Sequence, residues 1–324
     1  MELPGLRITT RHGAPTSLHP LSDLPSNISR RVEPPDHLVF RVDEPGTGAW
    51  NMAVDEALMD SARRGTVTLR FYTWKPHCLS LGRNQQTGRD PRAAQQDEPA
   101  LRPGAPRLRP DAPRLRPDAR LRPGEDVVRR PTGGRSVYHG PELTYCLTAP
   151  DRVWDGPRAI YGRVNRAIRH GLASLGAAID SPDAETPRSR RGEGGSTRPP
   201  PLGPDGCFRD PAPGEVIAQG RKLVGSAQWR HAGAILQHGS ILLNNQQERG
   251  TLEGLDLEAG RAAIGLVELL PRLPDAEELI AALRAAFEIE FDLAATPAGP
   301  DEDLAESARL LEAKYRSAAW TWRR

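Results

Sequence analysis

Residues 206–243 bring together a cysteine, a lysine and a histidine that could carry out acyl transfer. Cys207 comes first, Lys222 follows fifteen positions later, and the pair His238-Gly239 lies near the end. A cysteine is a good nucleophile only as its thiolate, and a pKa of about 8.5 leaves little thiolate at neutral pH. A nearby ammonium lowers that pKa. We therefore expect Cys207 and Lys222 to form a catalytic pair in which the thiolate attacks an incoming thioester. Because one thioester replaces another, such an exchange needs no ATP.

Lysine is rare in this chain, which draws attention to Lys222. Of the 44 basic residues only Lys75, Lys222 and Lys314 are lysines, so the chain uses arginine almost wherever it needs positive charge. A lysine in this background indicates a need for a compact ammonium whose pKa its surroundings can shift. The alternative interpretation is that Lys222 is a solvated turn residue.

The three cysteines differ in their sequence surroundings. Cys78 and Cys146 lie in apolar, strand-like runs, which is typical of buried cysteines that behave as small hydrophobic residues. Cys207 instead lies among glycine, proline and charged residues, where a nucleophile on a loop is expected. An odd number of cysteines, without a CxxC pair or a histidine cluster at ligand spacing, argues against a disulfide framework and against a metal site. We expect a cytoplasmic protein with no metal.

A glycine turn lies within the segment RRPTGGRSVYHGPELTY, residues 129–145. Gly133-Gly134 allows positive φ and close approach of a ligand to the backbone. Arg129, Arg130 and Arg135 bracket the turn, so it could hold an anionic group such as a phosphate or carboxylate. Taken alone, most such glycine pairs simply close hairpins, and His139 is more often a satisfied strand-end histidine than a catalyst.

Helices and strands must position these residues, and the order in which the sequence predicts them indicates an α+β fold, with helices packed on a mainly antiparallel sheet. Period-two alternation predicts strands over residues 37–46, 66–74, 78–85, 215–219, 222–229 and 234–243, and we expect 66–74 and 78–85 to form a hairpin. Residues 126–150 predict a short strand, the glycine turn and a second strand that ends at Pro150. Helical spacing of apolar residues predicts helices from an N-cap at Asn51 to Gly65, and over 157–176, 274–288 and 303–320.

Three segments lack the pattern of a packed fold. Residues 1–36 are rich in proline, serine and histidine and predict a disordered tail. Residues 91–124 contain repeated LRP units, and residues 181–205 are rich in proline and glycine, so both predict low-complexity inserts. We therefore expect one catalytic domain over 37–324. The formal net charge of +2 and the lack of a long apolar run give no argument for nucleic-acid or membrane binding.

Three segments together resemble the biotin/lipoate protein ligase and lipoyl/octanoyl transferase family. They are RRPTGGRSVYHGPELTY, GRKLVGSAQ and LQHGSILL, supported by NMAVDEAL, SLGRNQ and KYRSAAWTWRR. The resemblance covers residues 37–324 apart from the two inserts. Cys207-Phe208 with Pro211, placed before the GRK segment, is most similar to the cysteine-dependent octanoyltransferases that act on the glycine cleavage H protein. The family implies a catalytic domain like those of biotin ligases and class II aminoacyl-tRNA synthetases.

What the resemblance implies for function is an octanoyltransferase of protein lipoylation. The octanoyl group would pass from octanoyl-acyl carrier protein to a Cys207 thioester, then to a lysine of the glycine cleavage H protein or another lipoyl domain. No cofactor would be needed. Lys222 would lower the cysteine pKa and hold the acyl carbonyl. The residues implied for the acyl pocket are Arg130, Thr132, Gly133, Gly134, Arg135, His139, Gly225, Ser226, Ala227, Gln228, His238 and Gly239.

Two other functions remain open on the same scaffold. One is an ATP-dependent lipoate-protein ligase, in which Lys222 and the glycine turn would grip an acyl-adenylate, ATP and Mg²⁺ would be required, and Cys207 would be incidental. The other is a non-catalytic protein that only binds a lipoyl domain or an acyl group. The position of Cys207 and Lys222 favours the transferase.

Overall fold

The computed structural model describes residues 35–85, 124–181, 215–245 and 263–323, which belong to the second of the chain's two structural units, Val32–Arg324. The predicted tail over 1–36 and the predicted inserts over 91–124 and 181–205 fall outside these residues, except at their edges. Cys207 lies outside them as well. The domain limits therefore stay predictions.

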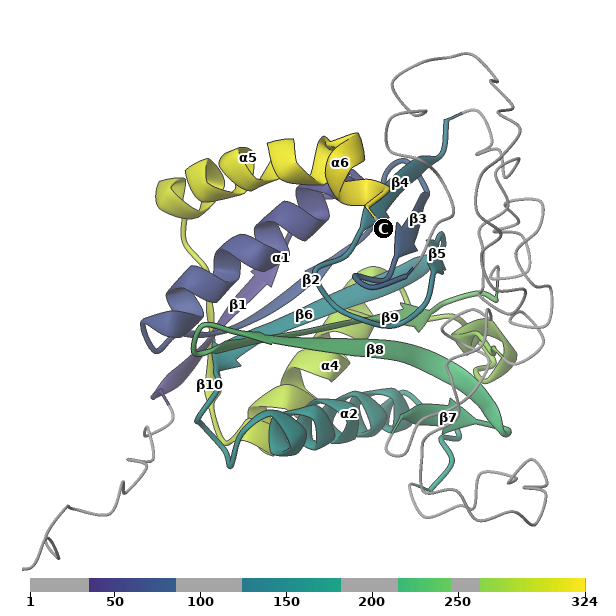
Figure 1. The fold of residues 1–324 in the computed structure, drawn as a ribbon. Coiled ribbons are helices and arrows are strands. Elements are labelled where there is room, and N and C mark those ends of the chain that lie inside the picture. Colours follow the sequence, from purple (N-terminus) through teal and green to yellow (C-terminus); the bar gives the residue numbers. More distant parts are fainter. Residues whose placement is uncertain (1–34, 86–123, 182–214, 246–262, 324) are drawn as a thin grey trace, which may run out of the picture. The chain divides into compact units, whose positions relative to one another are not determined.

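A large sheet forms the centre of the described unit (Figure 1). Its strands run in the order β10-β1-β2-β6-β9-β8-β7. Their bounds are β1 His37–Val42, β2 Val67–Tyr72, β6 Glu142–Pro150, β7 Val216–Ala218, β8 Arg221–His231, β9 Ala234–Leu242 and β10 Ala294–Pro297. The pairs of β1 with β10 and with β2 are parallel, and all the others are antiparallel. This confirms the α+β class and the mainly antiparallel sheet.

A second sheet of three short strands lies beside the end of the large one (Figure 1). Its order is β4-β3-β5, with β3 Cys78–Leu81 in the middle, β4 Asp126–Arg129 parallel to it and β5 Val137–His139 antiparallel to it. The expected hairpin between residues 66–74 and 78–85 is therefore wrong, because β2 and β3 belong to different sheets. Alternation alone identifies a strand but does not say which strand is its neighbour.

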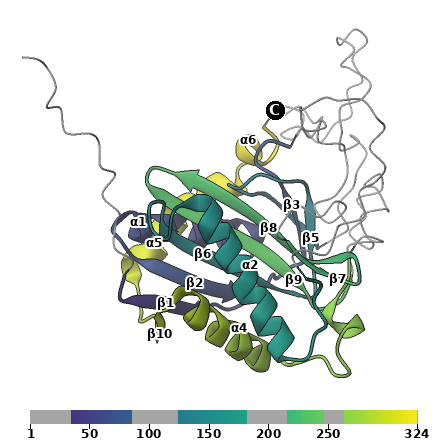
Figure 2. The ribbon, with the colours of Figure 1, turned by 90° about the horizontal axis from the view of Figure 1, so that it is seen from below.

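Helices cover both faces of the large sheet (Figures 1 and 2). On one face lie α1 Gly48–Arg63 and α5 Glu302–Arg316, with the short α6 Ala318–Thr321 after it; on the other lie α2 Pro157–Ser174 and α4 Ala276–Phe291. Each face has its own buried apolar cluster, one formed with α2 and α4 and one with α1 and α5. Within the described residues, no helix has the length and apolar character needed to cross a membrane.

Helix α1 begins earlier than the sequence predicts. Thr47, not Asn51, is its N-cap, and its side chain accepts a hydrogen bond from Trp50 N at 3.2 Å. Asn51 lies inside the helix and is fully buried, and its Nδ2 donates to Gly46 O at 3.1 Å and to Thr73 O at 3.0 Å. Both residue types are good N-caps, so only the contacts of Asn51 reveal its different role.

An arginine on β2 attaches α1 to the sheet. Arg70 is fully buried, and its Nη1 donates to Asp55 Oδ1 at 2.7 Å while its Nε donates to Asp43 Oδ2 at 2.7 Å. Tyr72 OH donates to the other oxygen of Asp55 at 2.9 Å. Burial alone would strongly disfavour both charges, so each requires the other.

Glu56, the residue after Asp55 in α1, binds two residues of α5. The Glu56 carboxylate accepts hydrogen bonds from Lys314 Nζ at 2.6 and 2.9 Å, and Tyr315 OH donates to it as well. Adjacent residues on α1 therefore point in different directions, Asp55 toward the sheet and Glu56 toward α5.

The first prediction concerns Arg70→Met, which leaves Asp55 buried without its cation. Removing one partner of a buried pair costs about 3–5 kcal/mol, so the free energy of unfolding should fall by that amount. The measurement is chemical denaturation at pH 7. The control is Arg272→Met, because Arg272 pairs with Glu278 at the surface and its removal should change little. Equal midpoints for the two variants would show that the buried pair does not stabilise the fold.

The second prediction concerns the contact of α2 with α4. A Cβ at Gly171 would lie 3.0 Å from Leu283 Cα and 3.1 Å from Ala282 O, so Gly171→Val must push the helices apart. Overpacking of this kind costs about 1–3 kcal/mol. Gly162→Val on the same helix is the control, because a Cβ there meets only the end of the Arg166 side chain, at 3.4 Å. Thermal unfolding should show a lower midpoint for Gly171→Val than for Gly162→Val.

Candidate active site

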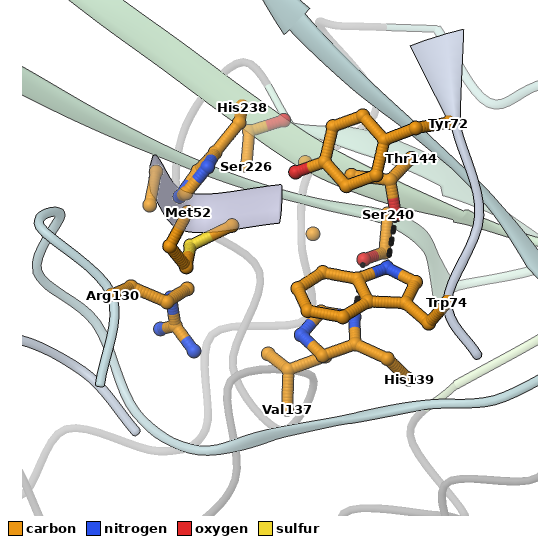
Figure 3. Close-up of a pocket in the computed structure, with 13 residues that line it drawn as sticks. Met52, Tyr72, Trp74, Arg130, Val137, His139, Thr144, Ser226, His238 and Ser240 are labelled. Carbon is orange, nitrogen blue, oxygen red and sulfur yellow. Dashed lines mark hydrogen bonds between the residues drawn. The ribbon is translucent and has the colours of Figure 1, made fainter. Parts of the chain in front are cut away.

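A cavity with an empty volume of about 330 Å³ opens between α1, the two sheets and the loop that follows β4 (Figure 3). Its lining is mostly apolar or small. The lining residues are Met52, Tyr72, Trp74, Arg130, Val137, His139, Thr144, Gly225, Ser226, Ala227, His238, Gly239 and Ser240.

The structure brings many of the residues implied for the acyl pocket to this cavity. Those that line it are Arg130, His139, Gly225, Ser226, Ala227, His238 and Gly239. Thr132 lies directly behind the wall, bonded to His238. Gly133, Gly134, Arg135 and Gln228 do not line it; the Gln228 amide instead donates to Pro157 O and Gln237 Oε1, at 3.0 and 3.2 Å.

Sequence reasoning missed the other walls, namely Met52, Tyr72, Trp74, Val137, Thr144 and Ser240. Most of them lie in apolar runs, where the pattern predicts core packing. Tyr72 is the last residue of β2, and Trp74 follows two positions later. Only the neighbouring sheet places their rings at a cavity. No signal in a single sequence separates such residues from ordinary core.

One wall of the cavity is the flat surface of β8 and β9. Gly239 pairs with Ser226, and a Cβ at Gly239 would lie 2.4 Å from Gly225 O and 2.8 Å from Tyr145 Cε1. Glycine is therefore required at position 239. Small residues at 225–227 leave space where larger side chains would fill the cavity.

His139 stands on one side of the cavity, stacked against the Trp74 ring with centroids 3.8 Å apart (Figure 3). Its Nδ1 lies 2.7 Å from Glu142 Oε1 and its Nε2 lies 2.5 Å from Ser80 Oγ. Arg130 Nη1 donates to that same hydroxyl at 2.6 Å. Both ring nitrogens thus have partners inside the protein.

His238 stands across the cavity from His139, beside Met52 (Figure 3). Its Nδ1 lies 2.9 Å from Asp55 Oδ2 and its Nε2 lies 2.7 Å from Thr132 Oγ1. Burial lowers the pKa of His238 more than the Asp55 carboxylate raises it, so the ring is neutral at neutral pH. Because a carboxylate only accepts, Nδ1–H donates to Asp55 and Nε2 accepts from the Thr132 hydroxyl.

Asp55 remains ionised beside this histidine. Burial would raise its pKa, but the hydrogen bond from His238 and the positive charge of Arg70 outweigh burial, and the pKa lies below its usual value. The carboxylate thus accepts from Arg70, Tyr72 and His238 together.

Arg130 holds the glycine turn itself, whereas Arg129 bonds to other parts of the chain. Arg130 donates to Gly133 O at 3.1 Å and to Arg135 O at 2.7 Å, while Arg129 donates to Gly82 O at 2.6 Å and Thr321 O at 2.8 Å. Burial, then the charges of Arg323 and Arg130, lower the pKa of Arg129 to about 10. The predicted role of the turn in holding an anion stays a prediction.

The close approach at this turn is made by the chain itself. Gly134 has φ of +89°, as expected for the turn, and a Cβ at Gly82 would lie only 1.9 Å from Gly134 O. The chain just after β3 therefore packs backbone to backbone against the glycine turn, which only glycine at position 82 permits.

Lys222 is buried near the cavity but does not line it. Its Nζ donates to Glu215 Oε1 at 2.7 Å, and the side chain is only 2% exposed. This excludes the alternative of a solvated turn residue. Lys222 lies three residues before Gly225 on β8, about 10 Å along the strand. Glu215 is the first described residue after Cys207, so Lys222 marks the place where that part of the chain joins the sheet.

The two cysteines that the structure describes are buried, as the sequence predicts. Burial raises the pKa of the Cys78 and Cys146 thiols well above the usual value. Neither is therefore a reactive thiol at neutral pH.

Comparison with known proteins shows to which family the chain belongs. The family described as lipoyl protein ligase A/B catalytic domain matches residues 47–288. Two proteins named octanoyltransferase LipM are similar over most of their length. The one from an Exiguobacterium species is 31% identical over 87% of this chain and 96% of its own, and the one from Kyrpidia tusciae is 34% identical over 86% and 96%.

A solved structure shows the same fold. It is titled as an archaeal lipoylation system, a bi-partite lipoate protein ligase and its E2 lipoyl domain from Thermoplasma acidophilum; it superposes with a TM-score of 0.58 at 19% identity, covering 88% of this chain and 96% of that one. Together with the match over residues 47–288, these similarities place the chain in the lipoyl protein ligase A/B catalytic domain family.

Proposed function

We propose that this chain is an octanoyltransferase of protein lipoylation. The octanoyl group would move from octanoyl-acyl carrier protein to Cys207 as a thioester, and then to a lysine of the glycine cleavage H protein or another lipoyl domain. The observation that carries the proposal is the similarity, at 31–34% identity over nearly their whole length, to proteins named octanoyltransferase LipM. The acceptor class is supported by the E2 lipoyl domain of the archaeal structure.

The cavity suits a medium-length acyl chain. Its walls offer the Met52 thioether, the Val137 side chain and the Trp74 ring, and Gly225, Ala227 and Gly239 on β8 and β9 keep that side of the cavity narrow in side-chain bulk. Burying methylene groups against such surfaces contributes about 0.8 kcal/mol each. Polar side chains such as Arg130, His139 and His238 also line it, and groups of this kind can orient a reacting carbonyl.

Two exchanges of acyl bonds make up the proposed reaction. In the first, the Cys207 thiolate attacks the donor carbonyl, a new C–S bond forms, and the carrier thiolate leaves with the electron pair of the old one. In the second, the acceptor amine attacks the Cys207 thioester, a C–N bond forms, the C–S bond breaks, and the proton lost by the nitrogen is taken up by the departing Cys207 thiolate. The first step conserves the bond type and the second is downhill, so neither step requires a cofactor or ATP.

Lys222 is the group that would favour the thiolate of Cys207. Its ammonium is already paired with Glu215, which reduces the positive charge that a second anion feels. Cys207 lies eight positions before Glu215 in the sequence, so covalent geometry keeps the thiol within about 30 Å of this pair.

The third prediction tests the cysteine intermediate. Incubation with octanoyl-acyl carrier protein alone should add one octanoyl mass to the intact protein, labile to hydroxylamine and absent in Cys207→Ala. Cys78→Ala and Cys146→Ala are matched controls, because their thiols are buried and should not be needed for the adduct. Intact-mass spectrometry with and without ATP makes the measurement. Acylation of a lipoyl domain only with ATP and free octanoate would identify a ligase instead, and binding without any transfer would identify a non-catalytic protein.

The fourth prediction concerns Lys222→Arg, which keeps a positive charge but replaces a compact ammonium by a larger planar group in a buried site. The rate of adduct formation should fall about tenfold or more, since each unit of cysteine pKa changes the thiolate fraction tenfold. Lys75→Arg is the control, because Lys75 is exposed. The readouts are adduct formation and iodoacetamide alkylation of Cys207 across pH. Wild-type rates in Lys222→Arg would contradict the role of the ammonium.

A further inference from the structure

Arginines gather beside the cavity, where the loop after β3 meets the last residues of the chain. Arg129 Nη1 donates to Arg83 O at 3.3 Å, and Arg323 Nη2 donates to the same carbonyl at 2.7 Å. Arg130 follows Arg129 and lines the cavity. We call Arg83, Arg129, Arg130 and Arg323 the arginine cluster. Neutral carbonyl oxygens hold these guanidinium groups together, and they leave the positive charge in place.

The charges of the arginine cluster act on one another. Burial and then the charge of Arg83 lower the pKa of Arg323. Burial and then the charges of Arg323 and Arg130 lower the pKa of Arg129 to about 10, so it still carries its proton at neutral pH. The cluster is therefore a region of positive potential in a chain whose formal net charge is only +2.

Two arginines of the cluster lie on tryptophan rings. Arg323 Cζ is 3.8 Å from the centre of the Trp320 ring, and Arg83 Cζ is 5.0 Å from the centre of the Trp229 ring. Trp320 Nε1 donates to Arg129 O at 2.8 Å, which fixes that ring. A stacked guanidinium still presents its N–H groups in the plane of its fork, where carboxylates bind. Both arginines and both tryptophans are only partly buried, so a partner in solution can reach them.

Trp229 shows where the cluster lies relative to the cavity. It follows the lining residue Ala227 by two positions on β8, and alternate residues of a strand share a face. The Trp229 ring, and Arg83 with it, therefore lies about 7 Å along the strand from the cavity wall. Lys222 lies in the opposite direction, seven residues or about 24 Å from Trp229. Along β8, the cavity wall thus separates the cluster from Lys222.

This separation distinguishes the two proteins of the proposed reaction, in which Cys207 reacts beside Lys222. The acceptor offers a lysine, whose amine ends a four-carbon stem, so the body of the acceptor must come close to Cys207. An acyl carrier protein holds its thioester at the end of a long flexible arm, so its body can rest farther away. The position of the arginine cluster therefore favours the carrier.

We propose that the arginine cluster, with Trp229 and Trp320, is the docking surface for a carboxylate-rich face of the acyl carrier protein that delivers the octanoyl group. This rests on the proposed function. Carboxylates of the carrier pair with Arg83 and Arg323, and its arm runs along β8 toward Lys222. Tryptophan and arginine are the residues that contribute most to protein interfaces, and complementary charge speeds association.

The fifth prediction compares two octanoyl donors in the full chain. One is octanoyl-acyl carrier protein, and the other is octanoyl-N-acetylcysteamine, an uncharged thioester without a protein. Intact-mass spectrometry measures the rate at which each loads Cys207, at donor concentrations below saturation. In Arg83→Glu and in Arg323→Glu, the ratio of carrier loading to small-thioester loading should fall about tenfold or more, because like charges then meet at the surface. Glutamine at either position should give a smaller fall.

The ratio is protected against a folding defect, because both donors load the same cysteine and a misfolded variant loses both rates. The control is Arg309→Glu, which makes the same change of net charge at an exposed position of α5 and should leave the ratio unchanged. Added salt should lower the wild-type ratio and change it less in Arg83→Glu. A wild-type ratio in both glutamate variants overturns the docking surface, as does an equal fall in Arg309→Glu.

Binding separates this proposal from the proposed function. If neither donor loads the wild-type protein, the cysteine thioester route is wrong. Isothermal titration calorimetry of acyl carrier protein with Cys207→Ala, with and without Arg83→Glu, then decides the docking surface. Affinity that the glutamate lowers supports it, whereas unchanged affinity or no binding overturns it. Variants that lose affinity for the lipoyl domain while carrier loading is unchanged also overturn it.

Discussion

The buried carboxylate of Asp55 is the constraint on which this site depends. An ionised carboxylate inside a protein is tolerated only when donors surround it, and here Arg70, Tyr72 and His238 do so. Two of these donors come from β2 and one from β9, while Asp55 belongs to α1. The contacts that compensate the charge therefore also fix the helix against the sheet, and the cavity between them takes its shape from electrostatics as much as from packing.

The glycine turn is fixed to this centre from two directions. Thr132 is bonded to His238, and Arg130 joins the turn to Ser80 on β3. Loops that carry binding residues are usually the variable part of a site, positioned by a rigid scaffold. Here the turn is tied to both sheets, so it behaves as part of the scaffold and keeps its polar groups in place before any substrate arrives.

The sequence predicts which segments form helices and strands better than it predicts which strands lie next to each other. Helical spacing identifies both ends of α2 and α4 to within three residues, whereas alternation in 66–74 and 78–85 cannot show that β2 and β3 enter different sheets. The residues of the site also divide into those that the sequence reveals and those that it hides. His139 and His238 stand out as polar residues in apolar strands, but Trp74 looks like core because its lining role arises only from the neighbouring sheet. The importance of Asp55 is similarly hidden, since an acidic residue in an amphipathic helix usually faces solvent.

Helix α1 has one further consequence, which follows from its two adjacent carboxylates. Asp55 holds the imidazole of His238, and Glu56 receives Lys314 and Tyr315 from α5. A rotation of α1 by a few degrees would alter both sets of contacts at once. Two adjacent side chains of one helix thus connect α5 on the outside with the imidazole at the cavity.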